Sequence, residues 1–335
     1  MKKIGNQTVK FDKPPKILAN AAVVGPMESE GPLGSEFDIC FKDSLAGEES
    51  WEKAESKLQK TAIERLLNKS KKAKKDIDFI FAGDLLNQCI ASSFGIKDFE
   101  IPFIGLYGAC STMALSLINA AVYVETGAAK NTIAVTSSHF CSAERQYRFP
   151  LEYGGVRPPT SQWTVTGSGA ILLGNGLNFP EIKAFTIGKI TDYGIKDANN
   201  MGAAMAPAAA ETIKAFLDDS ATNPEDYDAI FTGDLGHIGT KLLYELLDNE
   251  NIDLRGVHKD CGNMIFDPEK QDVHAGGSGC GCSASVLCSH IINGMKKGVY
   301  KNILFCATGA LMSPTSTMQG EKIPCIAHLV QISCI

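Results

Sequence analysis

The sequence predicts an α/β protein built from two diverged copies of one unit. Residues 78–85 and 228–235 each show an apolar run closed by Gly-Asp, which is typical of a buried strand followed by a polar loop. Each half then repeats an apolar helix, a closing glycine (Gly127 or Gly298), a Lys-Asn pair and a second strand. Two matches in the same order indicate a duplication. Because strands and helices alternate, mainly parallel sheets covered by helices are expected.

The elements around these matches set the domain boundaries. A helical pattern beginning at Trp51 precedes the first Gly-Asp strand, and a second pattern precedes the other strand. Pro207 is expected in the first turn of that second helix, where proline is well tolerated. The halves are predicted to span residues 1–178 and 179–335 and to pack as one compact unit.

The composition narrows the functional class. A formal net charge of -6 gives no overall attraction for nucleic acid. The eleven cysteines lie in mostly apolar contexts, which favours reduced thiols in an intracellular protein over a disulfide scaffold. No signal peptide is expected, because no apolar run follows the first lysines. No segment reaches the ~18 apolar residues of a membrane span, so any membrane association is expected to be peripheral.

Cys110 is the most suggestive single residue. It follows the apolar strand at 101–107 and a Gly-Ala pair, and it begins a helix. A thiol at a helix start favours the reactive thiolate, whereas the alternative role is that of a small buried apolar side chain. A nucleophile also needs a base and an oxyanion site. His139 and His328 follow or precede apolar runs at places that could face the same cleft.

Glycines and acids mark a second set of positions. The glycine-rich run at 276–282 opens the second copy's helix, and it either cradles an anion with backbone N–H groups or permits close backbone packing. Cys280 and Cys282 have no partner pair at zinc-ligand spacing, so no metal site is expected. Asp84 and Asp234 end matching strands and are either turn formers or cleft residues.

Two basic segments add further candidates. Residues 143–150 combine Arg145 and Arg148 with two aromatic residues. Arginine suits carboxylates and flat rings, while a solvated loop is the alternative. The run at 70–75 contains four lysines. It is either a solvated helix end or a contact for anionic lipid.

Segments along almost the whole chain resemble the stage V sporulation protein AD family. This family shares the thiolase-like fold with thiolases and ketoacyl-acyl-carrier-protein synthases. The resembling segments are EGPLG (30–34), AGDLLNQ (82–88), GACST (108–112), AERQ (143–146), EYGG (152–155), TGSGA (166–170), MAPAAA (205–210), AGGSGC (275–280), ATGAL (307–311) and IPCIAH (323–328). The resemblance implies two pseudo-twofold-related α/β halves in a five-layered αβαβα arrangement.

The resemblance also implies a function in sporulation. Members of the family bind dipicolinic acid (pyridine-2,6-dicarboxylate) and support its loading, with calcium, into the developing spore. The implied partners are the ligand, alone or as its calcium complex, and membrane proteins of the same operon. The implied location is intracellular, in the forespore or spore, at the periphery of the spore inner membrane. Neither a cofactor nor nucleic acid is implied, and the fold analogy suggests a homodimer.

The condensing-enzyme motif is only partly present. The catalytic histidine of those enzymes falls near Asp234, and their asparagine falls near Ser278, so the resemblance implies the fold and the cleft without catalysis. His237 is a candidate replacement for the base. The ligand-binding residues expected in the cleft are Asp84, Cys110, Ser111, His139, Glu144, Arg145 and Thr166. Cys110 and Ser111 would present the helix start to one carboxylate, and Arg145 would pair with the other.

Two other functions stay open from the sequence. The first is a working acyltransferase that uses Cys110 as its nucleophile. The second is a purely structural protein that docks membrane proteins and leaves the cleft empty or filled. Rapid alkylation of Cys110 would favour the acyltransferase, and an exposed apolar patch would favour the structural protein.

Overall fold

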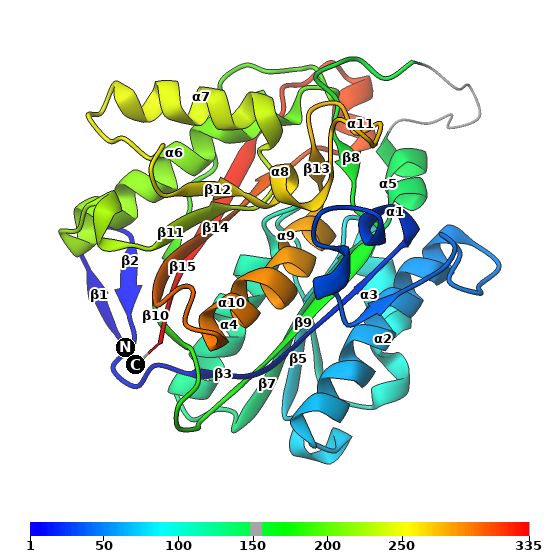
Figure 1. The fold of residues 1–335 in the computed structure, drawn as a ribbon, viewed down its shortest axis with the longest axis vertical. Coiled ribbons are helices and arrows are strands. Elements are labelled where there is room, and N and C mark those ends of the chain that lie inside the picture. Colours follow the sequence, from blue (N-terminus) through cyan, green and yellow to red (C-terminus); the bar gives the residue numbers. More distant parts are fainter. Residues whose placement is uncertain (148–155, 335) are drawn as a thin grey trace.

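The strands form two related half-sheets (Figure 1) in the computed structural model, which describes residues 1–147 and 156–334. In hydrogen-bonded order, the first half-sheet comprises β3 (Lys16–Val24), β9 (Gly167–Gly174), β7 (Asn131–Ser138), β5 (Phe79–Gly83) and β6 (Phe103–Gly105). The second comprises β10 (Glu181–Ile187), β15 (Cys325–Ser333), β14 (Asn302–Ala310), β11 (Ala229–Thr232) and β12 (His258–Asp260). Pairing of Lys16 with Glu181 joins β3 to β10, so the described strands make one continuous sheet.

Both half-sheets have the same mixed pairing. From β3 or β10 outward, the first two pairings are antiparallel and the next two are parallel. The matching order confirms the predicted pair of related halves. The expectation of mainly parallel sheets is wrong for the inner strands. The connection from β7 to β9 leaves and re-enters the sheet at the same end of the strands, so the two strands run antiparallel; a parallel pair needs a connection that crosses to the opposite end.

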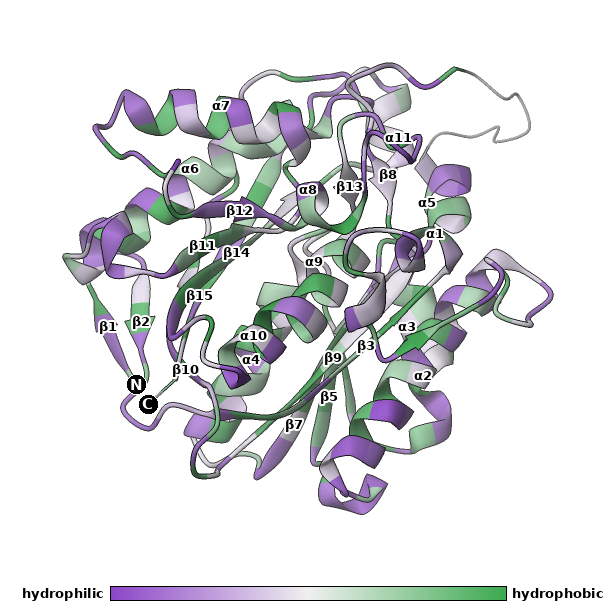
Figure 2. Cartoon of the chain, in the orientation of Figure 1, coloured by the Kyte–Doolittle hydropathy of each residue, from purple (hydrophilic) through white to green (hydrophobic). Residues whose placement is uncertain are grey.

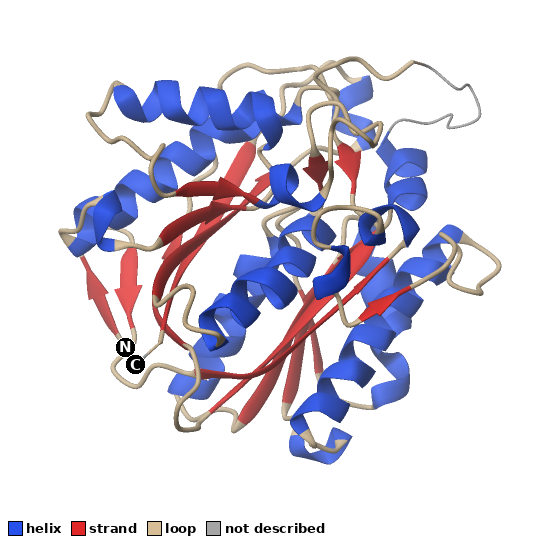
Figure 3. Cartoon of the chain, viewed as in Figure 1, coloured by secondary structure: helices blue, strands red, loops and turns tan. Residues whose placement is uncertain are grey.

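Helices complete a five-layered arrangement with the half-sheets (Figure 3). The outer helices of the first half are α2 (Trp51–Ser70) and α3 (Ile90–Ile96), and those of the second are α6 (Met201–Ser220) and α7 (Gly236–Asp248). The central layer contains α4 (Thr112–Glu125), α9 (Cys280–Val286), a π turn (Leu287–Ile291) and α10 (Ile292–Lys296). Helix α4 packs against strands of both half-sheets. The predicted αβαβα fold is therefore confirmed.

Short elements connect these layers. They are β1 (Lys2–Ile4), β2 (Thr8–Lys10), α1 (Pro26–Ser29), β4 (Ile39–Cys40), α5 (Phe140–Tyr147), β8 (Trp163–Thr164), α8 (Cys261–Ile265), β13 (Gly277–Ser278) and α11 (Pro314–Met318). Strand β2 pairs with β10, so the N-terminal hairpin packs on the second half. The division of the chain at 178 and 179 stays a prediction.

Apolar burial follows the layers. Met113 and Leu117 of α4 and Leu287 and Ile291 of the π turn belong to the central core. Two further cores lie beneath the outer helices, where Leu58 and Phe216 are examples. The central helices are accordingly largely apolar, whereas α2 and α7 alternate apolar and polar residues (Figure 2).

The repeated residues have the same structural role in both halves. Asp78 accepts hydrogen bonds from the backbone N–H groups of Lys130 (2.7 Å) and Asn131 (3.0 Å). Asp228 does the same for Lys301 (2.6 Å) and Asn302 (2.9 Å). The aspartates therefore fix the start of β7 and of β14, which explains why both copies retain them.

We expect Asp78→Ala and Asp228→Ala to destabilise the protein by similar amounts, about 1–2 kcal/mol each, because each removes two charge-assisted hydrogen bonds at a partly solvated site. Urea unfolding of both variants measures this effect. A large cost for one substitution and none for the other would contradict the structural equivalence of the two copies.

Helix α6 departs from the sequence-based expectation. Pro207 lies inside the helix, six residues after its first residue, Met201. The prediction that Pro207 opens the helix is therefore wrong. The residues before it are mostly alanine and methionine, which are strong helix formers and are largely buried here. Tertiary packing of this segment thus compensates for the missing N–H of proline.

Candidate functional site

A sharp turn places Cys110 between the two halves. Ala109 has a φ of 50°, which is unusual for a residue with a side chain. Thr112 Oγ1 donates to the Ala109 carbonyl (2.6 Å), and Ser111 Oγ donates to that of Gly108 (2.6 Å). Strand β14 also approaches this turn, since a Cβ on Gly309 would lie 2.3 Å from the Gly108 carbonyl oxygen. The turn is thus held from both sides.

Cys110 lines a small inner cavity of about 30 Å³. Its lining combines apolar and polar residues: Leu85, Ala109, Cys110, Ala143, Glu144, Tyr147, Thr164, Met201, Ser278, Ala310 and Met312. Thr164 of β8 and Ser278 of β13 are register partners in a two-stranded parallel sheet. A cavity of this size holds one or two waters. A larger ligand requires side chains to move.

The carboxylate of Asp234 lies beside the Cys110 thiol. It accepts hydrogen bonds from Thr308 Oγ1 (2.8 Å), from the backbone N–H of Gly279 (2.8 Å) and from Ser278 Oγ (3.3 Å). Burial raises the pKa of Asp234 to about 7. Burial, together with the Asp234 charge, raises the pKa of Cys110 well above its usual value. The site therefore favours the neutral thiol, and the expected thiolate is wrong.

The position of Cys110 explains this difference. Helix α4 begins at Thr112 with Ser111 at its N-cap, so Cys110 precedes the helix. The prediction that Cys110 begins the helix is wrong by this small offset. A buried thiol that faces a carboxylate is stabilised in its protonated form, and this effect outweighs the attraction of a helix start.

An outer cavity of about 300 Å³ adjoins the inner one. Tyr147 and Met312 line both cavities and separate them. The Tyr147 hydroxyl donates to the Leu85 carbonyl and lies 3.3 Å from the Tyr107 hydroxyl. The other residues of the outer cavity are Leu86, Asn87, Gln88, Cys89, Tyr107, Leu311 and Ser313.

Backbone strain lies at the wall of the outer cavity. Gln88 and Cys89 are consecutive and have φ values of 58° and 52°. Two adjacent non-glycine residues in the left-handed region are costly, and such strain clusters at ligand sites. The strained segment connects β5 to α3, directly after the Gly-Asp pair of the first copy.

The structure brings only part of the predicted ligand-binding set together. Cys110 and Glu144 line the inner cavity. Ser111 does not, because its hydroxyl is bonded within the turn. Thr166 accepts a hydrogen bond from the backbone of Phe140 (3.1 Å) and is not among the lining residues of either cavity.

Asp84 and His139 are buried away from the cavity lining. Asp84 accepts from the backbone N–H of Leu86 (2.9 Å) and from the N–H and hydroxyl of Ser92 (2.8 and 2.6 Å). The Nδ1 atom of His139 accepts from the Cys141 N–H (3.1 Å), and Nε2 donates to the Ser44 carbonyl (2.7 Å). Burial lowers the pKa of His139, so its neutral form is favoured. Both side chains serve the local structure.

Arg145 is directed away from the cavities. Its guanidinium is ion-paired with Glu52 and lies 5.0 Å from the centre of the Trp51 ring. Helix α5 thus presents Glu144 and Tyr147 to the cavity and Arg145 to α2. Arg148 and the segment 152–155 lie outside the described residues.

The other histidines considered as bases are also elsewhere. His237 is an exposed residue of α7, and its backbone N–H donates to the Ala275 carbonyl (2.8 Å). His328 is buried in β15, where burial lowers its pKa to about 4. Among the described residues, neither lines the inner or the outer cavity. The described residues contain no group of three or more His, Cys, Asp or Glu side chains able to hold a metal.

Sequence reasoning missed several lining residues. Tyr147 and Met312 separate the cavities, while Thr164 and Met201 contribute to the inner wall. Tyr147 belongs to the arginine- and aromatic-rich segment, so its residue type was a usable signal. Met201 and Met312 carry no such signal, because methionine is common in apolar cores.

Iodoacetamide at neutral pH is expected to modify the exposed Cys40 first, and Cys110 at least about 100-fold more slowly, because Cys110 is buried and its thiol is held in the protonated form. A time course followed by peptide mass spectrometry measures both rates. Fast and selective labelling of Cys110 would show instead that its thiol is activated.

Comparisons with known proteins agree with this geometry. A family model described as stage V sporulation protein AD (SpoVAD) matches residues 5–333. The stage V sporulation protein AD of Bacillus subtilis (strain 168) is 43% identical over 328 residues, which are 98% of this chain and 97% of that protein.

Solved structures show the same fold at low sequence identity. Cerulenin-bound OleA of Xanthomonas campestris has a TM-score of 0.63 at 13% identity. The match covers 96% of this chain and 99% of the OleA chain. The 3-oxoacyl-[acyl-carrier-protein] synthase III of Aquifex aeolicus VF5 has a TM-score of 0.57 at 13% identity, covering 95% of this chain and 99% of its own. The fold is thiolase-like, and the chain belongs to the stage V sporulation protein AD family.

Proposed function

We propose that this sporulation protein binds dipicolinic acid in the two adjoining cavities and does not catalyse acyl transfer. The observation that carries the proposal is the contact between Cys110 and Asp234. At the place where the resemblance to condensing enzymes puts a histidine base, a buried carboxylate lies beside the thiol and favours its protonated form. The cavity then offers neutral donors and apolar walls in place of an activated nucleophile.

The size of the cavities supports a two-part site. The inner cavity, at about 30 Å³, is too small for an aromatic dicarboxylate, whereas the outer one, at about 300 Å³, has room for it. Tyr147 and Met312 stand between them. A ligand reaching Cys110 must therefore displace these two side chains.

The charge of the cavities restricts the form of the ligand. The described lining residues include no lysine or arginine, and they include Glu144. Burying a bare dianion against neutral donors is costly. We therefore expect the ligand to bind with its charge neutralised, as the calcium complex, with hydrogen bonds from Asn87, Gln88 and the tyrosine hydroxyls.

Titration calorimetry tests this function. Purified protein is titrated with dipicolinate alone and with equimolar calcium, and benzoate with calcium serves as the control ligand. Binding that tightens with calcium and is absent for benzoate supports the proposal. No heat of binding in either arm would reject it.

An acyltransferase is the second candidate, because Cys110 stands at the turn that condensing enzymes use and the fold matches theirs. It predicts a covalent acyl group on Cys110 after incubation with acyl-coenzyme A. Intact-mass spectrometry of the wild type and of Cys110→Ser decides between the candidates.

We place the protein at the periphery of the forespore inner membrane, beside membrane proteins of its operon. No helix in the described part of the chain has the length and apolar character of a membrane span. We also propose that the protein forms a homodimer, as the fold analogy suggests. Fractionation of sporulating cells, with and without a high-salt wash, tests the location.

A further inference from the structure

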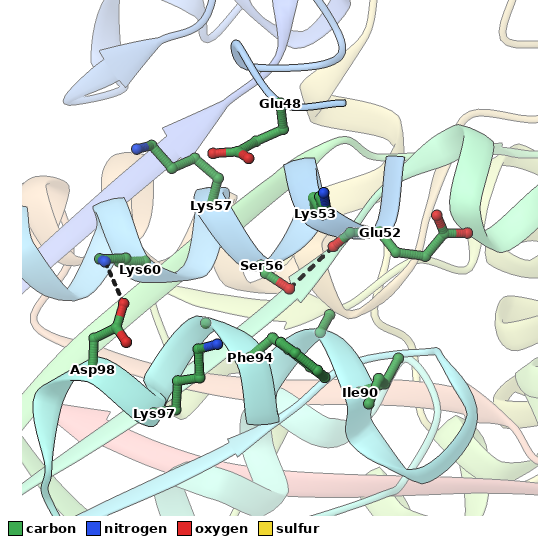
Figure 4. Close-up of a pocket in the computed structure, with 12 residues that line it drawn as sticks. Glu48, Glu52, Lys53, Ser56, Lys57, Lys60, Ile90, Phe94, Lys97 and Asp98 are labelled. Carbon is green, nitrogen blue, oxygen red and sulfur yellow. Dashed lines mark hydrogen bonds and ion pairs between the residues drawn. The ribbon is translucent and has the colours of Figure 1, made fainter. Parts of the chain in front are cut away.

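A groove lies between α2 and α3 on the outer side of the first half (Figure 4). Its volume is about 500 Å³, which makes it larger than either cavity near Cys110. Gly95 allows the two helices to approach closely at its base, since a Cβ there would lie 2.8 Å from the carbonyl oxygen of Ser56. We call this feature the α2–α3 groove.

Lysines stand on both walls of the α2–α3 groove. Lys53, Lys57 and Lys60 recur at helical spacing along α2, and Lys97 directly follows α3 (Figure 4). Lys53 is ion-paired with Glu49 at 2.6 Å. Among the described residues, no carboxylate lies within 4 Å of the Lys57 or Lys97 ammonium group. These two positive charges are available to a ligand.

Carboxylates in the groove are largely neutralised. Glu52 is ion-paired with Arg145, and Asp98 lies 2.7 Å from Lys60. Glu48 is the third carboxylate of the lining. The groove therefore keeps a net positive charge.

An exposed apolar pair lies beside these charges. Ile90 and Phe94 are one helical turn apart on α3, and they are 40% and 55% exposed. The ammonium group of Lys97 lies 4.8 Å from the centre of the Phe94 ring. Exposed aromatic and aliphatic side chains flanked by lysines are typical of surfaces that enter the interfacial layer of a bilayer.

The basic run at 70–75 continues the groove. Lys74 donates a hydrogen bond to the carbonyl of Asp98 (2.8 Å), and its ammonium group lies 5.0 Å from the Phe99 ring. These contacts join the run to the end of α3. The positive charge of Lys74 thus lies at the Asp98 end of the groove.

The second half provides an internal comparison. Helices α6 and α7 occupy the matching layer, yet their lysines are only Lys214 and Lys241, and Lys214 is ion-paired with Asp218 at 2.7 Å. The same scaffold therefore folds without a basic outer face. The lysines of the first half are not required by the fold.

We propose that the α2–α3 groove and the basic run at 70–75 dock this protein on anionic phospholipid bilayers. Lys57 and Lys97 contact the headgroup phosphates, while Ile90 and Phe94 enter the interfacial layer. Positive charge facing a negative surface attracts it, and each lysine near such a surface strengthens partitioning by roughly fivefold. The docking does not depend on ligand in the Cys110 cavities.

Vesicle flotation tests the proposal with the full chain. The probes are vesicles of equal parts phosphatidylglycerol and phosphatidylcholine, with pure phosphatidylcholine vesicles for comparison. Neutralising both available charges in Lys57→Gln/Lys97→Gln should lower partitioning by about 30-fold. Phe94→Ser should lower it by about tenfold without changing its dependence on salt. Thermal unfolding verifies that each variant is folded.

The control removes two exposed lysines from the second half, in Lys241→Gln/Lys259→Gln, which has the same net charge as the groove variant. The proposal holds if the control partitions like wild type and the groove variant does not. The proposal fails if wild type does not bind anionic vesicles, or if both double variants lose binding equally. It also fails if soluble polyglutamate binds with the same lysine dependence while vesicles do not, since the groove would then serve an acidic protein segment.

Discussion

Asn87→Trp is expected to weaken dipicolinate binding by at least about 30-fold, which is a loss of about 2 kcal/mol. Asn87 is an exposed residue that lines the outer cavity, so an indole at this position occupies the space the ligand needs. The backbone N–H of Asn87 still donates to Gln146 (2.9 Å), and the fold is retained. Calorimetry with the calcium complex measures the change.

Asn68→Trp is the matched control for this substitution. Asn68 is an exposed residue near the end of α2 and lines neither cavity. The affinity of Asn68→Trp for the calcium complex of dipicolinate should stay within about twofold of that of wild type, because no ligand-contacting group changes. If Asn87→Trp binds as well as wild type, the outer cavity is not part of the site.

The duplicated fold could be predicted because its signals are local. Asp78 and Asp228 each bond to the Lys-Asn pair of their own copy, so the motif is retained in both. Gly127 and Gly298 have φ values of 78° and 77° after their helices, a conformation that glycine adopts easily. Short-range requirements of this kind are visible in a sequence.

The candidate site was less predictable because side-chain direction depends on distant partners. Arg145 was expected to meet a ligand carboxylate, but Glu52 and Trp51 of α2 hold it outside the cavities. The Ser111 hydroxyl donates a hydrogen bond to the Gly108 carbonyl within its own turn. Nothing in the neighbouring sequence of either residue indicates these contacts.

The glycine-rich run combines the two roles that its sequence left open. The N–H of Gly279 donates to the carboxylate of Asp234, so the anion at this helix start belongs to the protein itself. Gly281 also permits close packing, since a Cβ there would lie 2.5 Å from the Gly167 carbonyl oxygen. The same backbone thus positions Asp234 beside Cys110 and brings the halves together.

The free energy of unfolding of Glu28→Gln is expected to fall less than that of wild type between pH 5 and pH 8, by about 3 kcal/mol. Burial raises the pKa of Glu28 from 4.5 to about 7. Between these values the folded chain keeps a proton that the unfolded chain has released. The contribution of Glu28 to stability is therefore greatest below pH 4.5 and is lost as the pH rises from 4.5 to about 7, by roughly 1.4 kcal/mol per pH unit.

The glutamine keeps the contact that the structure requires and removes the charge. One carboxyl oxygen of Glu28 accepts the N–H of Thr166 (2.8 Å), while the other is buried without a hydrogen bond among the described residues. Urea unfolding should therefore show a more stable variant at pH 8 and little difference at pH 5. Glu30→Gln, which removes a neighbouring exposed carboxylate, should leave the profile unchanged. Equal slopes for wild type and Glu28→Gln would contradict the raised pKa of Glu28.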